Sequence, residues 1–325
     1  MDRRAFNLAL GSAALSAAAQ AQTSGRVYRL ATLHPAMLLN EAHPLGKIML
    51  NGLARDGFAL GKNLALEARN AGGDLEKVPK LLQELVAGKP DAIVAVGYPV
   101  LKAAESLGVA IVAAFGTGDP VACGLIKSFS HPGGNITGIS DDAAALTAKR
   151  LDLLKAMVPG LRRVAMLWNK DDLGMTLRYE VGAKVAQSLD ISIQPLGVRA
   201  PDDFNDAFAQ MDRDPPDGII LVADSLTTLN RRRVFEYAAA RRLPAVYEVD
   251  FLVLEGGLMS YGADLKESFE RTAAFVSRIF KGAKPGDLPF EFPTRYKLAI
   301  NQKTANALGL AIPLLLLAQA DEVID

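Results

Sequence analysis

Short apolar segments alternate with amphipathic segments along most of the chain. Residues 91–97 (DAIVAVG) and 109–115 (VAIVAAF) are nearly continuous apolar runs, which are typical of strands covered on both faces. Residues 74–87 instead repeat apolar positions at the spacing of a helix. The pattern predicts strands over 26–33, 63–70, 91–97, 109–115, 162–169, 191–198, 217–224 and 243–248. It predicts helices over 42–56, 74–87, 99–107, 173–189, 202–212, 227–241 and 264–281.

This alternation predicts parallel sheets with helices on both faces. It falls into two long runs, which predict two sheets and therefore two lobes. Segments rich in glycine or proline, at 130–140, 256–262 and 288–294, indicate three crossovers, so the lobes exchange parts of the chain. The predicted first lobe takes residues 26–138 with about 264–290, and the second takes 139–263 with about 291–325.

The first 21 residues, MDRRAFNLALGSAALSAAAQA, have the three parts of a secretory signal peptide. Arg3-Arg4 supplies the basic start, residues 8–19 are apolar or small, and residues 19–21 (AQA) form a cleavage site. Because the two arginines also fit a twin-arginine signal, both the Sec and the twin-arginine routes stay open. We expect cleavage near Ala21 and a periplasmic mature protein. The most apolar later run, Ile312–Ala318, is too short to span a bilayer and is predicted to be buried core.

The composition argues against catalysis and against nucleic-acid binding. Lysine and arginine number 36, as do aspartate and glutamate, so the chain lacks the positive excess that binds phosphates. One cysteine, Cys123, and three histidines leave little material for a metal site or for acid–base chemistry. Walker A, G-x-S-x-G and H-E-x-x-H sequences do not occur, and residues 116–121 (GTGDPV) only begin like a dinucleotide fingerprint. We therefore predict a protein that is not an enzyme and needs no cofactor or metal.

Two pairs of adjacent aspartates, Asp141-Asp142 and Asp171-Asp172, lead into predicted helices. Adjacent side chains point apart, which disfavours a shared acid–base role. Aspartate also accepts hydrogen bonds from the free N–H groups at a helix start. Both pairs are therefore predicted to cap helices.

In open parallel sheets, ligands bind beyond the carboxyl ends of the strands. This rule selects the following candidates for a ligand site: Thr32, Leu33, Gly97, Tyr98, Phe115, Gly116, Thr117, Asn169, Asp224, Ser225, Tyr247 and Glu248. Hydroxyl and N–H groups would hold a carboxylate, and Asp224 or Glu248 would hold an ammonium, which suits an amino acid. Tyr98 and Tyr247 would cover an apolar side chain. The alternative is ordinary structure, with capping by Asp224 and Ser225 and packing by Tyr247.

Four segments together resemble a known family. They are FGTGDPVACGLIKSFSHPGGNITGIS (115–140), GGLMSYGADL (256–265), FKGAKPGDLPFEFPTRYKLAINQKTANALGLAIP (280–313) and ADEVID (320–325). In this order they resemble ABC-transporter substrate-binding proteins of the tryptophan/tyrosine-type subfamily. The resemblance implies the α/β fold of type I periplasmic binding proteins, with two Rossmann-like lobes, parallel sheets and three hinge crossovers. It also implies an ABC permease and ATPase as partners, and an aromatic or branched amino acid or a similar solute as ligand. One departure is Tyr98, because members often carry a small hydroxyl residue at that point.

The resulting hypothesis is hinge closure, in which the solute binds one lobe and the other closes over it. Glycines near the crossovers would absorb the backbone change, unless they only serve turns: Gly133, Gly134, Gly256, Gly257 and Gly262. We expect a monomer that delivers its solute to an importer. A periplasmic module that presents its ligand to a receptor and an enzyme on the same fold are the alternatives. A transcription regulator of this fold would need a helix-turn-helix where the signal peptide stands.

Overall fold

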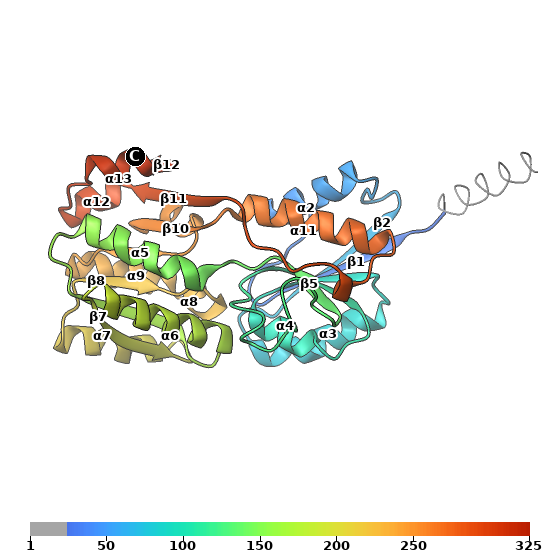
Figure 1. Ribbon diagram of the computed structural model, residues 1–325, viewed down its shortest axis with the longest axis horizontal. Helices are drawn as coiled ribbons and strands as arrows, with labels where there is room; N and C mark the ends of the chain where they lie inside the picture. Colours follow the sequence, from blue (N-terminus) through green and yellow to red (C-terminus); the bar gives the residue numbers. More distant parts are fainter. Residues whose placement is uncertain (1–24) are drawn as a thin grey trace, which may run out of the picture.

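The described residues form two lobes that lie side by side (Figure 1). The computed structural model describes residues 25–325, without the side chains of residues 143 and 144. The predicted signal peptide and its cleavage site lie outside the described residues. Within residues 25–325, no helix is both long and apolar enough to cross a membrane.

Over the described residues, the first lobe contains a five-stranded parallel sheet in the order β2-β1-β3-β4-β5. Its strands are β1 (Tyr28–His34), β2 (Leu64–Asn70), β3 (Ala92–Val96), β4 (Ala110–Phe115) and β5 (Ile136–Gly138). Its helices are α2 (Pro44–Arg55), η1 (Leu75–Lys77), α3 (Val78–Ala87), α4 (Tyr98–Ala104), α11 (Leu265–Phe280) and η2 (Pro285–Asp287). Although α11 comes late in the chain, it packs on α2 and β4 of this lobe (Figure 1).

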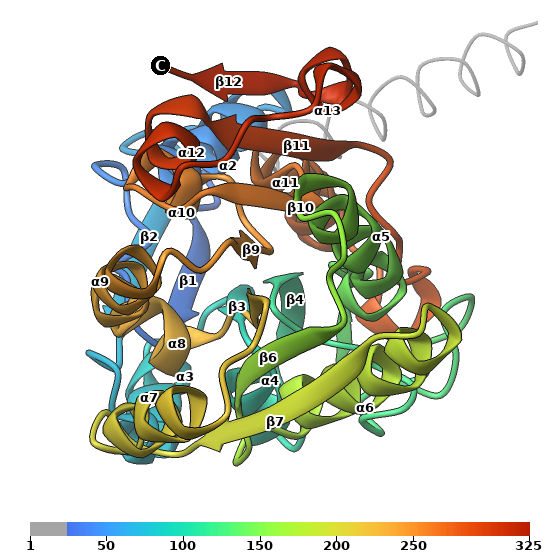
Figure 2. The ribbon, with the colours of Figure 1, turned by 90° about the vertical axis from the view of Figure 1, so that its left-hand side faces the viewer.

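The second lobe, over the same described range, contains a seven-stranded sheet in the order β12-β11-β10-β9-β8-β6-β7 (Figure 2). Its strands are β6 (Arg163–Asn169), β7 (Ser192–Val198), β8 (Gly218–Leu221), β9 (Ala245–Tyr247), β10 (Met259–Ala263), β11 (Tyr296–Asn301) and β12 (Glu322–Ile324). Its helices are α5 (Ala143–Met157), α6 (Leu173–Ser188), α7 (Asp203–Arg213), α8 (Ser225–Leu229), α9 (Arg231–Arg241), α10 (Phe251–Leu254), α12 (Gln302–Leu308) and α13 (Leu314–Gln319). In Figure 2, α5 and α6 lie on one side of the sheet and α7, α8 and α9 on the other. Among the described residues, all strand pairs of this sheet are parallel as predicted, except that β10 and β11 run antiparallel.

The central strands are buried on both faces, as their apolar runs predict. Along β3, Ala92, Val94 and Val96 belong to one apolar cluster of the first lobe, and Ile93 and Ala95 belong to another. Successive side chains of a strand point to opposite faces, so this division places β3 between two apolar layers.

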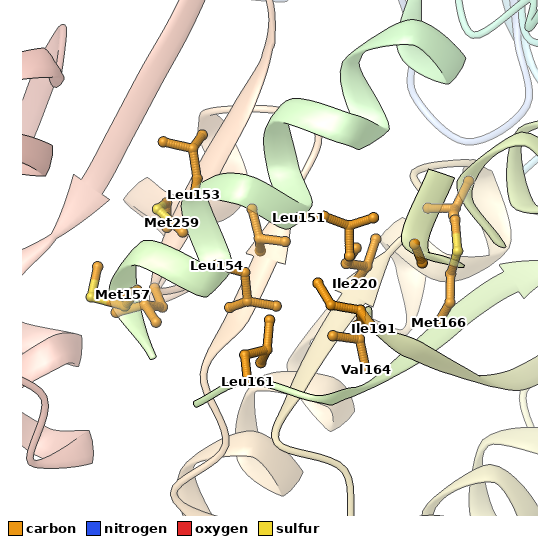
Figure 3. Close-up of a cluster of buried hydrophobic side chains, with 14 of the residues drawn as sticks. Leu151, Leu153, Leu154, Met157, Leu161, Val164, Met166, Ile191, Ile220 and Met259 are labelled. Carbon is orange, nitrogen blue, oxygen red and sulfur yellow. The ribbon is translucent and has the colours of Figure 1, made fainter. Parts of the chain in front are cut away.

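The second lobe has the same construction around its own sheet. Leu151 and Leu154 of α5 pack with Val164 and Met166 of β6 and with Ile220 of β8 (Figure 3). A separate cluster fills the opposite face of this sheet. Each lobe therefore has its own core, which allows the lobes to move as separate bodies.

Two of the predicted crossovers contain strands. Residues 130–140 include β5, and residues 256–262 overlap β10, which pairs with β9 and β11. The chain passes between the lobes just after each strand. Both strands are short and contain glycine, so their composition is similar to that of loops.

The three connecting segments lie side by side and are hydrogen-bonded to one another. The N–H of Ser140 donates to the carbonyl oxygen of Glu291 at 2.8 Å, and the N–H of Glu291 donates to that of Gly138 at 2.9 Å. The N–H of Asp264 donates to the carbonyl oxygen of Arg295 at 3.1 Å. The third segment thus joins the other two at the hinge.

The apolar run Ile312–Ala318 is not buried core, and that prediction is wrong. Most of it lies in α13, where Leu314 is 84% exposed and Leu315 is 69% exposed, whereas Leu316 is buried. This short helix lies near the edge strand β12 (Figure 2). A helix at an edge covers its lobe with one face only, so an apolar run along it also meets solvent.

Candidate functional site

The two lobes touch where the strands of both sheets end. Gly174, in the first turn of α6, lies against the first lobe: a Cβ atom placed there would be 3.0 Å from the carbonyl oxygen of Thr117 and 3.2 Å from the Cβ of Tyr98. A Cβ atom on Gly118 would lie 3.0 Å from the Cα of Gly174. The lack of side chains at both glycines lets the two backbones approach, and the lobes are closed on one another.

Apolar side chains also cross this interface. Phe115, at the end of β4, packs against an apolar cluster of the second lobe. Leu177 of α6 packs against a cluster of the first lobe. The contact between the lobes therefore has an apolar part beside its polar part.

Two acidic residues of the second lobe are hydrogen-bonded to Asn169. The Nδ2 of Asn169 donates to Asp224 Oδ2 at 2.7 Å, and the carbonyl oxygen of Asn169 accepts from the N–H of Asp172 at 3.3 Å. Asp172 caps α6 by accepting from the N–H of Met175 at 3.2 Å. Asp224 caps α8 by accepting from the N–H of Thr227 at 2.8 Å. The ends of the neighbouring strands β6 and β8 thus bring two acidic groups together.

The carboxyl group of Asp172 is held in an unfavourable environment for a negative charge. Burial, followed by the nearby charge of Asp224, raises its pKa to about 7. Among the described residues, neither Asp172 nor Asp224 forms an ion pair. The two carboxylates therefore make a negative site at the lobe interface.

A buried network of four charged side chains lies beside this site. Glu248 accepts from Arg150 Nη1 at 3.0 Å, from Arg178 Nη1, and from the N–H of Ala223 at 3.0 Å. Arg178 Nη2 also donates to Asp141 Oδ2 at 2.7 Å. All four charged residues are at most 2% exposed. The guanidinium groups of Arg150 and Arg178 already bind the Glu248 carboxylate. Glu248 is therefore not available to bind the ammonium group of a ligand, as the sequence had suggested.

The predicted capping roles of the aspartate pairs hold only in part. Asp172 caps α6 as predicted. The predicted capping role of Asp141 is wrong, because its carboxylate is buried and paired with Arg178. Asp142 occupies the cap position of α5 without a side-chain cap, and it accepts from the hydroxyl of Tyr296 at 3.1 Å. Asp171 is exposed and pairs with Arg199 at 2.9 Å.

Three of the predicted site residues have side chains inside a lobe. Thr32 Oγ1 donates to the carbonyl oxygen of Leu39 at 2.9 Å, and Leu33 belongs to the apolar core. Tyr247 is buried and packs edge to face on Phe235, with 5.3 Å between the ring centroids. Burial raises the pKa of Tyr247. These side chains stabilise the strands that end at the interface.

Glycines shape the first lobe's side of the interface. Gly97 and Gly116 have positive φ angles of 84° and 74°, which favour glycine. A Cβ atom on Gly116 would lie 3.3 Å from the Cα of Gly97, so the ends of β3 and β4 come close together. Tyr98, which begins α4, is thereby placed against the first turn of α6.

Two polar atoms near the interface are buried without a hydrogen-bond partner among the described residues. They are Thr117 Oγ1 and Arg178 Nε. Thr117 has no exposed surface, and its carbonyl oxygen lies against Gly174. Buried polar groups without partners cost free energy, so each of these two atoms can take a hydrogen-bond partner that the described residues do not supply.

The structure adds four residues to the predicted site: Asp141, Asp172, Gly174 and Arg178. The sequence contained a signal for Asp172, which follows the end of β6 by three residues. It contained none for Arg178, because the pattern of a helix does not show that an arginine on it is buried and paired.

A surface groove of about 490 Å³ lies elsewhere on the second lobe. It is lined by residues that include Trp168, Lys170, Gly197, Asp203 and Gln210. None of the interface residues described above lines it. In the described part of the chain, no group of three side chains could hold a metal ion.

Comparison with known proteins places the chain among transport proteins. Residues 34–324 match a family model described as ABC transporter substrate binding protein. A relative named tyrosine-binding protein, from Clostridioides difficile (strain R20291), is 23% identical over 266 residues, which cover 81% of this chain and 76% of the relative.

Two solved structures have the same fold. A conserved domain protein from Vibrio cholerae has a TM-score of 0.85 and 24% identity, over 92% of this chain and 100% of that chain. An ABC domain from Streptococcus pneumoniae, in complex with L-Trp, has a TM-score of 0.83 and 24% identity, with the same coverage. The predicted fold class, two α/β lobes with mostly parallel sheets, is confirmed.

Proposed function

The chain belongs to the family of ABC transporter substrate-binding proteins, and we propose that it captures an aromatic or branched amino acid between its lobes in the periplasm. On this proposal it delivers the solute to an ABC permease and its ATPase, acts as a monomer, and catalyses no reaction. The family is one of binding proteins, so the resemblance found in the sequence is confirmed at that level.

The observation that carries the proposal is the polar lining of the lobe interface. Among the described residues, Thr117 Oγ1 and Arg178 Nε are buried without hydrogen-bond partners, and neither Asp172 nor Asp224 forms an ion pair. A zwitterionic amino acid has both a cation and hydrogen-bond acceptors to offer to such a set. The tyrosine-binding relative and the neighbour in complex with L-Trp support an aromatic side chain.

The proposed mechanism is closure about the three hydrogen-bonded connecting segments. A ligand shifts an open–closed equilibrium only when it binds the closed state more tightly, which requires contacts to both lobes. Tyr98 and Thr117 would supply those of the first lobe, and Asn169, Asp172 and Asp224 those of the second. The permease would then recognise the closed form.

A thermal-shift screen of residues 22–325 tests the proposal. We expect L-tyrosine, L-tryptophan or L-leucine to raise the unfolding midpoint in a concentration-dependent manner, because a ligand that binds only the folded state stabilises it. Neutral sugars should leave the midpoint unchanged. An unfolding midpoint that rises with a sugar and with none of the amino acids would refute the assignment of the ligand.

A further inference from the structure

We propose that Leu229 of the second lobe and Gly73 of the first lobe form a latch that stabilises the closed state of the protein. This inference rests on the proposed function, because it names a contact that hinge closure makes between the lobes. The latch acts without touching the solute. It sets how long the closed state, and therefore the bound solute, persists.

The contact joins the two lobes directly. Leu229 is the last residue of α8, and Gly73 lies in the turn that follows β2. A Cβ atom on Gly73 would lie 2.5 Å from Leu229 Cδ1. Since carbon atoms in contact are about 3.5–4.0 Å apart, the leucine occupies the space that a side chain at position 73 would need.

The latch and the contact at Gly174 lie on different sides of the proposed ligand site. In the first lobe, Gly73 follows β2 and Gly118 follows β4, and the strands β1 and β3 lie between these two strands in the sheet. Because neighbouring strands are about 4.8 Å apart, β2 and β4 are about 14 Å apart. In the second lobe, Leu229 follows β8 and Gly174 follows its neighbour β6. The two contacts therefore flank the ends of β1 and β3, and Tyr98 follows β3.

The turn that receives Leu229 is held on the first lobe by hydrogen bonds. The N–H of Gly73 donates to the carbonyl oxygen of Pro35 at 2.8 Å, and the N–H of Gly72 donates to Asn70 Oδ1 at 2.9 Å. The φ angles of Gly72 and Gly73 are 64° and 87°, which favour glycine at both positions. The turn is therefore a fixed surface of the first lobe.

The helix that carries Leu229 is fixed at its start. Asp224 and Thr227 form a capping box at the beginning of α8, and Thr227 Oγ1 donates to the carbonyl oxygen of Val222 at 2.7 Å. Leu226 packs against the apolar cluster of the second lobe, whereas Leu229 is 50% exposed. Because the contact of Leu229 with the first lobe exists only when the lobes meet, it favours the closed state over the open one.

Calorimetric titration of residues 22–325 with L-tyrosine, L-tryptophan and L-leucine tests the latch. We expect Leu229→Ala to weaken binding by about three- to tenfold, because the closed state loses part of an apolar contact that the open state lacks. Dissociation of the ligand, followed by stopped-flow fluorescence, should become faster by a similar factor. The unfolding midpoint of the free protein should stay unchanged, whereas a purely structural role of Leu229 would lower it.

The matched control is Leu254→Ala. Leu254 is 54% exposed and ends α10, which packs on β10 and β11 of its own lobe. This variant should bind the amino acids as the parent does. An equal loss of affinity in both variants would overturn the latch, because the position of the leucine would then not matter.

Cross-linking tests the contact without a known ligand. In a variant that combines Gly72→Cys with Leu229→Cys, a short bismaleimide should join the two thiols, because the irreversible reagent traps even brief closure. Gly72 is exposed, and a Cβ atom there meets no atom closer than 3.9 Å. Cys123 is buried and burial raises its pKa to about 12, so its thiol should not react. The control, Leu229→Cys alone, should give no linked peptide.

The possible failures are distinguishable. If the parent binds one of the amino acids and Leu229→Ala binds it equally well, the latch is wrong and the proposed function stands. If the parent binds none of the three amino acids, the proposed function fails, and the cross-linking experiment decides the latch by itself. A folded double-cysteine variant in which mass spectrometry finds no linked peptide overturns the latch.

Discussion

Four buried charged side chains of the second lobe, two arginines and two acids, form one network. Removing one partner from such a network leaves a charge in the protein interior without compensation. Glu248 is the critical member, because it accepts from both Arg150 and Arg178. Its role is therefore to neutralise and position two guanidinium groups rather than to contact a ligand.

We expect Glu248→Ala to lower the free energy of unfolding by about 3–5 kcal/mol, because two buried arginines lose their shared acceptor. Denaturation in urea, followed by circular dichroism, measures this change. The matched variant Asp171→Ala removes an exposed partner of Arg199 and should cost less than about 1 kcal/mol. Equal costs for the two variants would mean that burial of the network has no energetic consequence.

At the scale of elements, α6 connects three parts of the proposed site. Asp172 caps its start, Gly174 in its first turn touches the first lobe, and Arg178 one turn later reaches Asp141 just after the first crossover. Residues four apart on a helix share a face, so Gly174 and Arg178 both point toward the lobe interface. A change in this one helix should therefore affect closure and ligand binding together.

We expect Gly174→Ala to weaken L-tyrosine binding by about 5- to 150-fold, because the added Cβ lies 3.0 Å from the Thr117 carbonyl oxygen and overpacking costs about 1–3 kcal/mol. The unfolding midpoint of the free protein should not fall, because alanine is a better helix former than glycine. Calorimetry and thermal unfolding measure the two effects. The control Gly108→Ala meets no atom within 4 Å and should change neither quantity. Full affinity in Gly174→Ala would show that closure does not need this close contact.

At the scale of the whole molecule, two lobes with separate cores meet at one interface and are joined by three hydrogen-bonded segments. In residues 25–325, the lobes share no apolar core that would hold them rigidly, although Phe115 and Leu177 cross between them. An arrangement of this kind permits rotation about the connecting segments. The contacts at Gly174 and Gly118 then define the closed end of that motion.

Small-angle X-ray scattering should therefore show a smaller radius of gyration when L-tyrosine is added at a saturating concentration. The physical reason is that ligand contacts to both lobes favour the closed state over the open one. 3-(4-Hydroxyphenyl)propionate, which lacks the ammonium, should leave the radius unchanged. An unaltered radius with a ligand that calorimetry shows to be bound would exclude hinge closure.

Much of the fold could be predicted because its signals are local. The strand predicted at 91–97 is β3, and the helix predicted at 173–189 is α6, since apolar periodicity over such lengths is specific. The edge strands β5 and β12 were not predicted, because each has only three residues and these carry no usable period. Residues 312–318 were misassigned because hydrophobicity alone does not say whether a helix lies in the centre or at the edge.

The sequence by itself determined the alternation of elements, the two lobes, and the rule that a ligand meets the strand ends. Only the tertiary structure decided which polar groups are already paired there. Arg178 is 37 residues from Asp141 and 70 residues from Glu248, so packing alone brings them together and occupies them. The same packing links Asp172 and Asp224 through hydrogen bonds to Asn169, and neither carboxylate forms an ion pair among the described residues. Pairing over such distances depends on how the elements pack in three dimensions, which local periodicity does not encode.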